Sequence, residues 1–528
     1  MYRHCIGSED CLSGRLHSVF ALLIAILPVS VIHAASNPDP SRVVVLANSS
    51  DRDSVNLANH YARTRNIPQK NLVLLSAPRT EEVDWVEFSR QIFNPLRESL
   101  IDRELMDGRF GNNEDAFGRR FFVPLSSSVE YLVVCRGIPL RLKNEVSKFS
   151  AEQLKQIPVI YRTTTGSVDT ELALLTTANH SPLGWVSNPL FKRKKPDSLS
   201  LESVVKVSRL DGPTQETSMR LVDLAIVGEK AVYGRAYVDS GGPHKLGNQW
   251  MGAVAKRLEI DGFEVDMDHS PKLFNAGQRF DAPLFYFGWH SYHMQGPFAR
   301  RDIRFPPGAM IFHIHSFSAQ SLRTDSRYWA GPLIQRGVTA TIGNVSEPYL
   351  HLTHHLPLLL EGLLEGKCLA DSAYYALPSL GWQAILLGDP LYRPAIAHSI
   401  SPSLKIDQEF DPFHPEQYGI IRRIKVLYQK GAGSEGYHLG RSYLTQKYGL
   451  PLALSLIRLG SDQTHSDGGT TLLLPVIAYH PKGFQEVAPM IQAAKLLYKA
   501  GRTRDYKRIL KNIATLRNLP PELNEQMP

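Results

Sequence analysis

The sequence predicts an α/β protein with mostly parallel sheets and flanking helices, followed by an α-helical tail. Between about residues 40 and 395, short and continuously apolar runs alternate with segments of helical periodicity. This alternation is typical of parallel strands that are covered on both faces. Beyond about residue 400 the strand pattern fades and the apolar residues favour helices. The chain has 528 residues, roughly three to four times a usual domain length, so two or three units are expected.

The first unit, 40–145, is expected to alternate strands with helices. Its apolar runs bounded by turn residues predict strands, and its 3.6-residue periodicity predicts helices. Pro95 falls within the second periodic segment, where it would kink a helix. The expected strands are 43–47, 72–75 and 131–135, and the expected helices are 54–65 and 83–100.

Residues 146–200 interrupt this alternation and are interpreted as an insertion. They are enriched in Ser, Thr, Asn and Pro, and they contain the basic run 192–195 before Pro196. A second α/β unit, 201–398, follows the insertion. Its expected strands are 204–210, 232–238, 284–287, 310–314 and 338–342, with helices from Pro213 to about 227, over 250–260, and in a segment that runs through 364.

The C-terminal region, 399–528, is expected to be a small helical array. Helices are predicted over 420–428, 437–448, 451–459 and 487–500. Gly431, Gly433 and Gly436 match G-x-G-x-x-G, but no βαβ unit surrounds them, so they are interpreted as glycines that join helices. No cofactor is expected.

The N-terminus has the pattern of a secretory signal. Arg15 precedes an apolar run from Val19 to Val29, and small residues follow, with cleavage expected after Ala34. The alternative is an uncleaved anchor, but Pro28 interrupts a run already shorter than the roughly 20 residues of a spanning helix. The mature protein, 35–528, is therefore expected to be soluble and exported, either periplasmic or extracellular.

Composition narrows the function classes further. Hydrophobic residues make up 43% and charged residues 21%, which excludes a disordered or fibrous protein. Of the four cysteines, two lie in the expected signal, so the main body cannot build a disulfide framework or a four-cysteine zinc site. Cys135 and Cys368 are expected to be buried thiols, with a disulfide between them as the alternative.

The net charge of +8 bears on partners. A positive charge makes nucleic acid a remote possibility as a partner. Export disfavours this partner, and so does the absence of a basic stripe interleaved with aromatic residues. The basic C-terminal helices are interpreted as a solvated face, and a peripheral contact with an anionic membrane or polymer is the alternative. Their basic residues are Lys495, Lys499, Arg502, Arg504, Lys507, Arg508 and Lys511.

Two strand ends carry residues suited to chemistry. In a parallel α/β sheet, ligands bind beyond the carboxyl ends of the strands. His290 follows the strand at 284–287, and Ser316 follows the strand at 310–314. If these strands are neighbours, the two side chains emerge at one edge as a nucleophile and a proton-transfer partner.

Further residues at the ends of strands are ligand-binding candidates. Arg136 and Asp211 follow the third and fourth expected strands, so both are expected at the same crevice, with salt bridges or turn hydrogen bonds as the alternative. Asn344 and Glu347 follow the strand at 338–342 and complete this set.

Several motifs resemble an uncharacterised family of exported bacterial proteins, some of which carry a C-terminal sorting tail. The likeness covers most of residues 40–395 and implies no established activity. The motifs are 136–140 (RGIPL), 209–213 (RLDGP), 315–319 (HSFSA), 343–349 (GNVSEPY) and 388–394 (GDPLYRP).

A more distant likeness concerns the chemistry. The order of strand, histidine, strand and nucleophile position, then helix and Gly-Asp-Pro, is similar to the catalytic region of gingipain-type and caspase-like cysteine peptidases. That likeness implies a caspase-like fold for the second unit and matches His290 to the catalytic histidine. Here Ser291 follows the histidine where those peptidases have glycine, and Ser316 stands at the cysteine position.

Two functional hypotheses remain open. In the first, a degenerate peptidase-like core binds a peptide, glycan or protein partner at the crevice, and Ser316 is a small polar residue that caps a helix. In the second, Ser316 and His290 hydrolyse an amide or ester bond. A serine hydroxyl needs a base, an orienting group and an oxyanion hole, and the carboxylates available to orient the base are Asp302, Asp325 and Glu347.

One constellation suggests a metal instead. Glu347, His351 and His355 are spaced i, i+4 and i+8, so on a helix they would share one face, with His354, His313 and His315 nearby. The pattern lacks the His-Glu-x-x-His order of zinc peptidases, and Pro348 places Glu347 before a helix. A polar helix face is the preferred interpretation, and no metal is expected.

Overall fold

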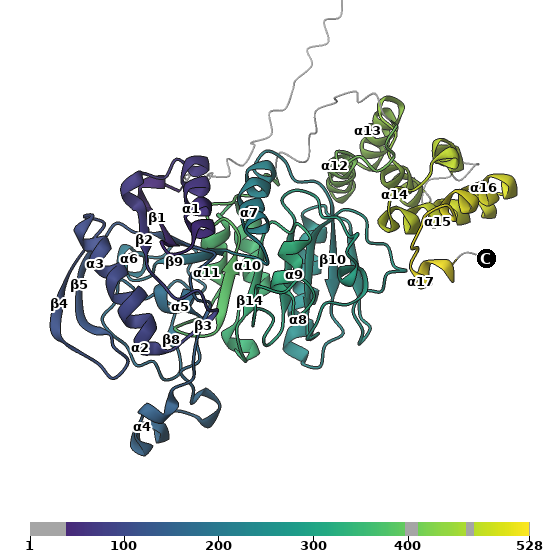
Figure 1. Ribbon diagram of the computed structural model, residues 1–528. Coiled ribbons are helices and arrows are strands. Elements are labelled where there is room, and N and C mark those ends of the chain that lie inside the picture. Colours follow the sequence, from purple (N-terminus) through teal and green to yellow (C-terminus); the bar gives the residue numbers. More distant parts are fainter. Residues whose placement is uncertain (1–37, 397–409, 461–468, 527–528) are drawn as a thin grey trace, which may run out of the picture. The chain divides into compact units, whose positions relative to one another are not determined.

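The computed structural model describes residues 38–396, 410–460 and 469–526, and these residues form an α/β core with a helical C-terminal region (Figure 1). The predicted fold class is confirmed. The expected signal, 1–34, lies outside the described residues and remains a prediction. Within the described residues, no helix is both long and apolar enough to span a membrane.

The larger sheet has six strands in the order β14-β16-β9-β6-β1-β2. Strand β1 pairs in parallel with both β2 and β6, and β6 pairs in parallel with β9. Strand β14 is antiparallel to β16. The bounds are β1 (Val43–Asn48), β2 (Leu72–Leu75), β6 (Tyr131–Cys135), β9 (Lys206–Leu210), β14 (Thr341–Asn344) and β16 (Ala384–Leu387). The sheet thus combines strands from the ranges 40–145 and 201–398.

A second sheet of four parallel strands has the order β11-β10-β12-β13. Its bounds are β10 (Arg235–Asp239), β11 (Val265–Asp268), β12 (Pro283–Trp289) and β13 (Met310–Ile314). Met310 forms a parallel bridge with Ala340, and the Ile311 amide donates to the Ala340 carbonyl at 3.1 Å. Strand β13 therefore lies beside β14, and the two sheets meet there.

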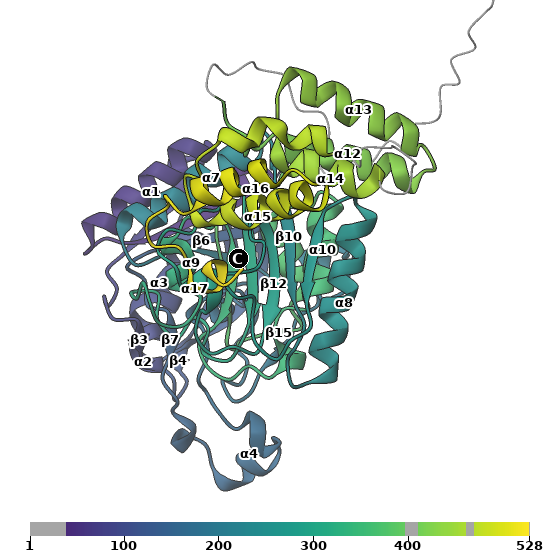
Figure 2. The same ribbon diagram turned by 90° about the vertical axis from the view of Figure 1, so that its right-hand side faces the viewer.

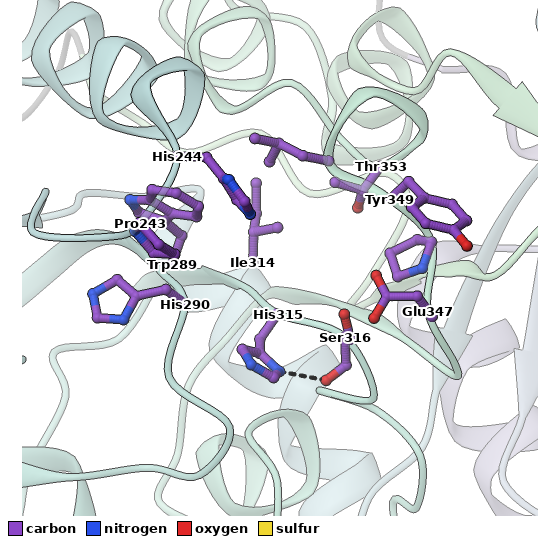
Figure 3. Close-up of a pocket in the computed structure, with 12 residues that line it drawn as sticks. Pro243, His244, Trp289, His290, Ile314, His315, Ser316, Glu347, Tyr349 and Thr353 are labelled. Atoms are coloured by element: carbon purple, nitrogen blue, oxygen red, sulfur yellow. Dashed lines mark hydrogen bonds between the residues drawn. The ribbon is translucent and has the colours of Figure 1, made fainter. Parts of the chain in front are cut away.

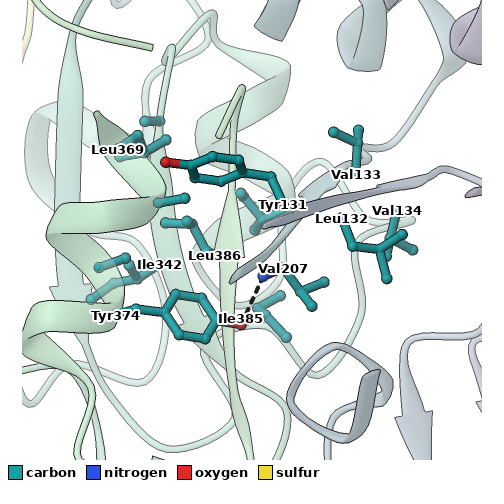
Figure 4. Close-up of a cluster of buried hydrophobic side chains, with 14 of the residues drawn as sticks. Tyr131, Leu132, Val133, Val134, Val207, Ile342, Leu369, Tyr374, Ile385 and Leu386 are labelled. Carbon is teal, nitrogen blue, oxygen red and sulfur yellow. Dashed lines mark hydrogen bonds between the residues drawn. The ribbon is translucent and has the colours of Figure 1, made fainter. Parts of the chain in front are cut away.

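The central strands of both sheets are buried along their whole length, as their apolar runs predict. All residues of β1, β6, β12 and β13 are buried. Figure 4 shows the core of the larger sheet, in which Tyr131 and Val133 of β6 and Ile385 and Leu386 of β16 belong to one buried cluster. The Tyr374 hydroxyl accepts a hydrogen bond from the Val207 amide at 2.9 Å, which satisfies a strand amide that lacks a strand partner.

Helices follow most of the strands. They include α1 (Arg52–Arg65), α7 (Gln215–Gly228), α8 (Lys245–Ile260), α9 (Ala330–Gln335), α10 (Leu356–Leu364) and α11 (Leu369–Ala376). The periodic segment 83–100 forms α2 (Trp85–Phe88), a π-helical turn (Ser89–Phe93) and α3 (Asn94–Asp102). Pro95 is the second residue of α3 and follows the π-helical turn directly, so the continuous helical run departs from regular α-helical geometry just before the proline.

Several elements were not predicted. The hairpin of β4 (Met106–Glu114) and β5 (Arg120–Ser127) has a partly exposed antiparallel pairing, and β11 and β16 are four residues long. The insertion contains α4 (Ala151–Lys155), α5 (Val168–Leu172), β8 (Val186–Ser187) and α6 (Ser198–Glu202). Two short pairs complete the sheets: β3 (Glu82–Val83) with β7 (Arg141–Leu142), and β15 (Ser379–Leu380) with β8.

The insertion contributes to the core. Asp169 of α5 is buried and forms an ion pair with the buried Arg209 of β9. The Ser167 hydroxyl donates to the Ala384 carbonyl of β16 at 2.8 Å. The polar composition of this segment therefore does not mark it as a surface loop.

The C-terminal region is helical throughout its described part, as predicted. Its helices are α12 (Gln417–Gln429), α13 (Gly433–Gln446), α14 (Leu450–Gly460), α15 (Phe484–Lys499), α16 (Thr503–Ile513) and α17 (Pro521–Asn524), with a 3-10 segment at Thr470–Ala478. Gly431 joins α12 to α13 with a φ of 79°, a conformation that favours glycine.

The tail packs against the four-stranded sheet. Val487 and Met490 of α15 share a buried cluster with Tyr237 of β10 and Tyr286 of β12, and Figure 2 shows α15 and α16 in front of these strands. The Tyr418 hydroxyl also donates to the Asp281 carboxylate at 2.6 Å. The tail thus covers one face of this sheet.

The two cysteines of the main body are free and buried, as their apolar surroundings predict. Cys135 ends β6, and Cys368 precedes α11 with its sulfur 3.8 Å from the Tyr131 hydroxyl. Burial raises the pKa of both thiols above its ordinary range, so both are poor nucleophiles.

Candidate functional site

A cavity of about 240 Å³ opens where the loops after β10, β12, β13 and β14 meet (Figure 3). We call it the histidine crevice. Its lining is mostly aromatic, imidazole and apolar, with Glu347 as its one carboxylate and no lysine or arginine. The residues that line it are Pro243, His244, Trp289, His290, Ile314, His315, Ser316, Glu347, Pro348, Tyr349, Leu350 and Thr353.

The loop after β12 places His290 on one side of the crevice. Trp289 is 4% exposed, and its indole donates to Asn248 Oδ1 at 3.1 Å, which fixes the end of the strand. The His290 amide donates to the Ile314 carbonyl at 3.1 Å. The His290 Nε2 atom is buried without a hydrogen-bond partner in the described chain. Burial, aided by nearby His315, lowers the pKa of His290, so its imidazole is neutral at pH 7.

The loop after β13 carries His315 and Ser316. His315 Nδ1 hydrogen-bonds the backbone carbonyl of Ser316, drawn as a dashed line in Figure 3. Because a carbonyl only accepts, the proton sits on Nδ1, and burial lowers the pKa of this imidazole too. The Ser316 hydroxyl makes no hydrogen bond to any described residue, and in Figure 3 it lies on the side of Glu347.

The loop after β14 supplies the opposite wall. Glu347 is exposed, and within the described chain its carboxylate has neither an ion pair nor a hydrogen bond. The ring of Tyr349 packs edge-on against the ring of Tyr161 in the insertion, and the two ring centroids are 5.7 Å apart. The Tyr161 hydroxyl is 2.7 Å from His351 Nε2. The insertion therefore supports this wall of the crevice.

The three loops share an unusual backbone conformation. His290, Phe317 and Tyr349 have φ values of 79°, 61° and 62° and follow β12, β13 and β14, respectively. A positive φ strains any residue other than glycine, and such strain clusters at functional sites. Its repetition around one cavity favours a functional role for the crevice.

A buried polar network lies beneath these loops. The Tyr286 hydroxyl donates to Asp239 Oδ2 at 2.7 Å and lies 3.3 Å from His313 Nδ1. His313 stacks on Trp329 at 3.6 Å between centroids, and both side chains reach the Ser291 carbonyl, at 3.1 and 2.8 Å. Burial raises the pKa of Asp239 to about 7. The network holds the residue that follows His290.

The crevice brings together three of the predicted site residues: His290, Ser316 and Glu347. Asn344 is buried beneath them, and its Nδ2 donates to the His315 carbonyl at 3.2 Å. Arg136 lines a second cavity, and Asp211 is buried with its carboxylate paired to Arg323. The candidates thus divide between two cavities.

Sequence reasoning missed His244, His315 and Tyr349 as lining residues. His315 directly precedes Ser316 in the sequence, so its position after the strand was a usable signal. His244 is the N-cap residue of α8 and follows a glycine-rich loop. The sequence of that loop does not indicate that it brings His244 to the crevice.

The alternative metal arrangement fails on geometry. Helix α10 begins at Leu356, and only a short 3-10 turn at Leu350–Leu352 precedes it, so Glu347, His351 and His355 do not share a helix. His355 packs instead against Trp250, at 4.5 Å between ring centroids. The described residues contain no group of three His, Cys, Asp or Glu side chains placed to hold a metal.

The basic side chains of the tail are exposed on α15 and α16. They include Lys495, Lys499, Arg504, Lys507, Arg508 and Lys511. Their contact with an anionic membrane or polymer remains a prediction.

Comparisons with known proteins add little. No family model matches the chain, and no curated protein matches it. One solved structure, described as "Structure of Protease", superposes with a TM-score of 0.36 and 10% identity over 68% of this chain and 79% of that chain. A likeness this weak carries no argument about function.

Proposed function

We propose that the protein binds a peptide, and that the histidine crevice receives one basic side chain of it without cleaving the chain. The cavity of about 240 Å³ is smaller than pockets for whole drug-sized ligands, which begin at about 300 Å³. It therefore suits a single side chain of a longer ligand.

The exposed Glu347 carboxylate carries the proposal. It is unpaired in the described chain, and it lines the same cavity as aromatic rings and as His290 and His315, whose pKa values are lowered by burial. A lysine or arginine side chain would pair with Glu347 through its charged end, and its apolar stem would lie against Ile314, Leu350 and the rings. An anionic ligand would meet a like charge there instead.

Two features disfavour hydrolysis. No hydrogen bond joins Ser316 to His290 or to His315 Nε2 in the described chain, so its hydroxyl has no base in place. The amide after Ser316, that of Phe317, already donates to the Ser346 carbonyl at 2.8 Å. An acyl-transfer site needs such amides directed at the developing oxyanion.

A serine hydrolase is the second candidate, because one observation favours it. His290 Nε2 is buried, neutral and without a partner in the described chain, and His290 lines the same cavity as Ser316. Hydrogen bonds of catalytic groups often tighten only when substrate binds. This candidate requires His290 to reach Ser316 in the complex.

One experiment separates the two candidates. The purified protein, 35–528, is incubated with a peptide library, and mass spectrometry identifies both the retained peptides and any cleavage products. Glu347→Gln removes the charge from the crevice. Glu435→Gln makes the same change at an exposed position on α13 and serves as the matched control.

We expect retained peptides to be enriched in lysine or arginine for the wild type and the control. Glu347→Gln should weaken binding at least tenfold, because a charge-assisted contact is lost. Retention that is independent of basic residues, or equal in Glu347→Gln, would overturn the proposal. Cleavage products that vanish in both Ser316→Ala and His290→Ala would establish the hydrolase.

A further inference from the structure

A second cavity, of about 450 Å³, lies where the loops after β1 and β6 meet. We call it the arginine cavity. Its charged lining consists of four arginines and two aspartates: Arg52, Arg79, Arg136, Arg323, Asp51 and Asp53. It shares no lining residue with the histidine crevice.

The cavity lies at the point of the six-stranded sheet where the direction of the strand connections reverses. Strand β1 has β2 on one side and β6 on the other, so the connections from β1 and from β6 run in opposite directions across the sheet. In parallel α/β sheets, ligands bind outside the carboxyl ends of the strands at such a reversal. Asp51, Arg52 and Asp53 follow β1, and Arg136 directly follows β6.

The loops around the cavity are held in place without a ligand. Asn48, fully buried at the end of β1, donates through Nδ2 to the carbonyls of Ala77 and Gly137, both at 2.8 Å. This one side chain links the loops after β1, β2 and β6. Gly137 has a φ of 100°, and a Cβ there would lie 3.0 Å from Asp51 Oδ2, so the close approach of the two loops requires glycine.

The arginines differ in how they are paired. Arg323 is committed to the Asp211 carboxylate, and Arg79 lies 3.6 Å from Asp51. Arg136 is 4.0 Å from Asp211 and makes only a 3.4 Å contact with the Gly212 carbonyl. Arg52 is exposed and has no ion pair in the described chain. Two guanidinium groups are therefore available to an incoming anion.

We propose that the arginine cavity binds a phosphate group. Guanidinium groups bind phosphate through charge-assisted, often bidentate hydrogen bonds. A planar carboxylate is satisfied by one guanidinium, whereas the oxygens of a tetrahedral phosphate can accept from arginines on different walls. Here Arg52 comes from the start of α1 and Arg136 from the loop after β6. The start of α1 is already capped by the Asp51 carboxylate, which accepts from the Asp53 amide at 3.1 Å, so the proposal rests on the two arginines.

Inorganic phosphate is the probe for this site, titrated into the full protein by calorimetry at pH 7 and constant ionic strength. Succinate, a dianion whose two carboxylate groups are each planar, is titrated in parallel. The variants are Arg136→Gln and Arg52→Gln. Arg423→Gln removes the same charge at an exposed position on α12 and is the matched control.

We expect saturable phosphate binding that is equal in the wild type and Arg423→Gln and at least tenfold weaker in both cavity variants. Because Arg52 is exposed and unpaired, Arg52→Gln should fold normally and keeps the test valid if Arg136→Gln does not. Absence of phosphate binding, equal affinity in Arg52→Gln, or preference for succinate would overturn the proposal. Neither peptide binding nor cleavage at the histidine crevice affects this result.

Discussion

The histidine crevice and the arginine cavity both lie beyond the ends of parallel strands, yet they treat charge in opposite ways. In the crevice the imidazoles of His290 and His315 are kept neutral by burial, and Glu347 stands alone at the rim. Asp211 does not line the arginine cavity, but it is buried and pairs with Arg323, which does. The histidine crevice can bind one positively charged group through Glu347. The arginine cavity instead presents several positively charged side chains to a ligand.

The difference between the two carboxylates, Asp211 and Glu347, separates a structural role from ligand binding. A buried, paired carboxylate supports its neighbours, and its loss leaves uncompensated cations. An exposed, unpaired carboxylate contributes little to stability and remains available to a ligand. The two kinds of site should therefore respond differently to the same substitution.

The largest effect is expected from removing the buried carboxylate. Asp211→Ala should lower the free energy of unfolding by about 3 kcal/mol, because a buried ion-pair network loses its shared anion. Glu347→Ala should change it by less than about 0.5 kcal/mol. Chemical denaturation measures both, and equal losses would contradict the distinction.

A second prediction concerns the network beneath the crevice. Because burial raises the pKa of Asp239 to about 7, the folded state holds a proton there that the unfolded state releases near pH 4. Stability should therefore fall as the pH rises from about 4 to 7, by up to about 1.4 kcal/mol per pH unit from this group. In Asp239→Asn that part of the pH dependence should disappear in thermal unfolding between pH 4 and 8. An identical pH profile in the variant would show that Asp239 is ionised in the folded protein.

The smallest effect is expected in the pH dependence of peptide binding. Since burial lowers the pKa values of His290 and His315 below the ordinary value of 6.5, both imidazoles are mainly neutral at pH 7 and above. Affinity for a lysine peptide should be constant from pH 8 to 7 and should fall about threefold on acidification below pH 6.5, as positive charge appears beside Glu347. Fluorescence anisotropy follows this directly. A gain of affinity for the lysine peptide on acidification would contradict its pairing with Glu347.

The sequence predicted the fold where strands are continuously apolar. Val43–Asn48, Tyr131–Cys135 and Met310–Ile314 were found because burial on both faces leaves runs that are almost entirely apolar, with Asn48 and His313 as the exceptions. Strand β16 was missed because its four residues resemble the end of a helix, and β4–β5 because its exposed hairpin carries charged residues. Such pairings depend on tertiary contacts that one sequence does not display.

Part of the candidate site was also predicted, because residues that follow neighbouring parallel strands lie at the same edge of the sheet. His290, Ser316 and Glu347 follow neighbouring strands, so strand order alone brings them to one cavity. Arg136 and Asp211 were expected in that crevice too, but they follow strands of the six-stranded sheet and belong to the second cavity or its support. The order of the strands in the two sheets decides which loops meet. The hydrophobic periodicity of the sequence does not reveal that order.

The most direct test of peptide binding without cleavage is a calorimetric titration of one retained arginine- or lysine-containing peptide, followed by mass spectrometry of the same sample. Wild type and Ser316→Ala should bind with equal affinity and return the peptide intact, whereas Glu347→Gln should bind at least tenfold more weakly. Shortened peptide from the wild type, together with intact peptide from Ser316→Ala, would contradict the account and identify Ser316 as a nucleophile.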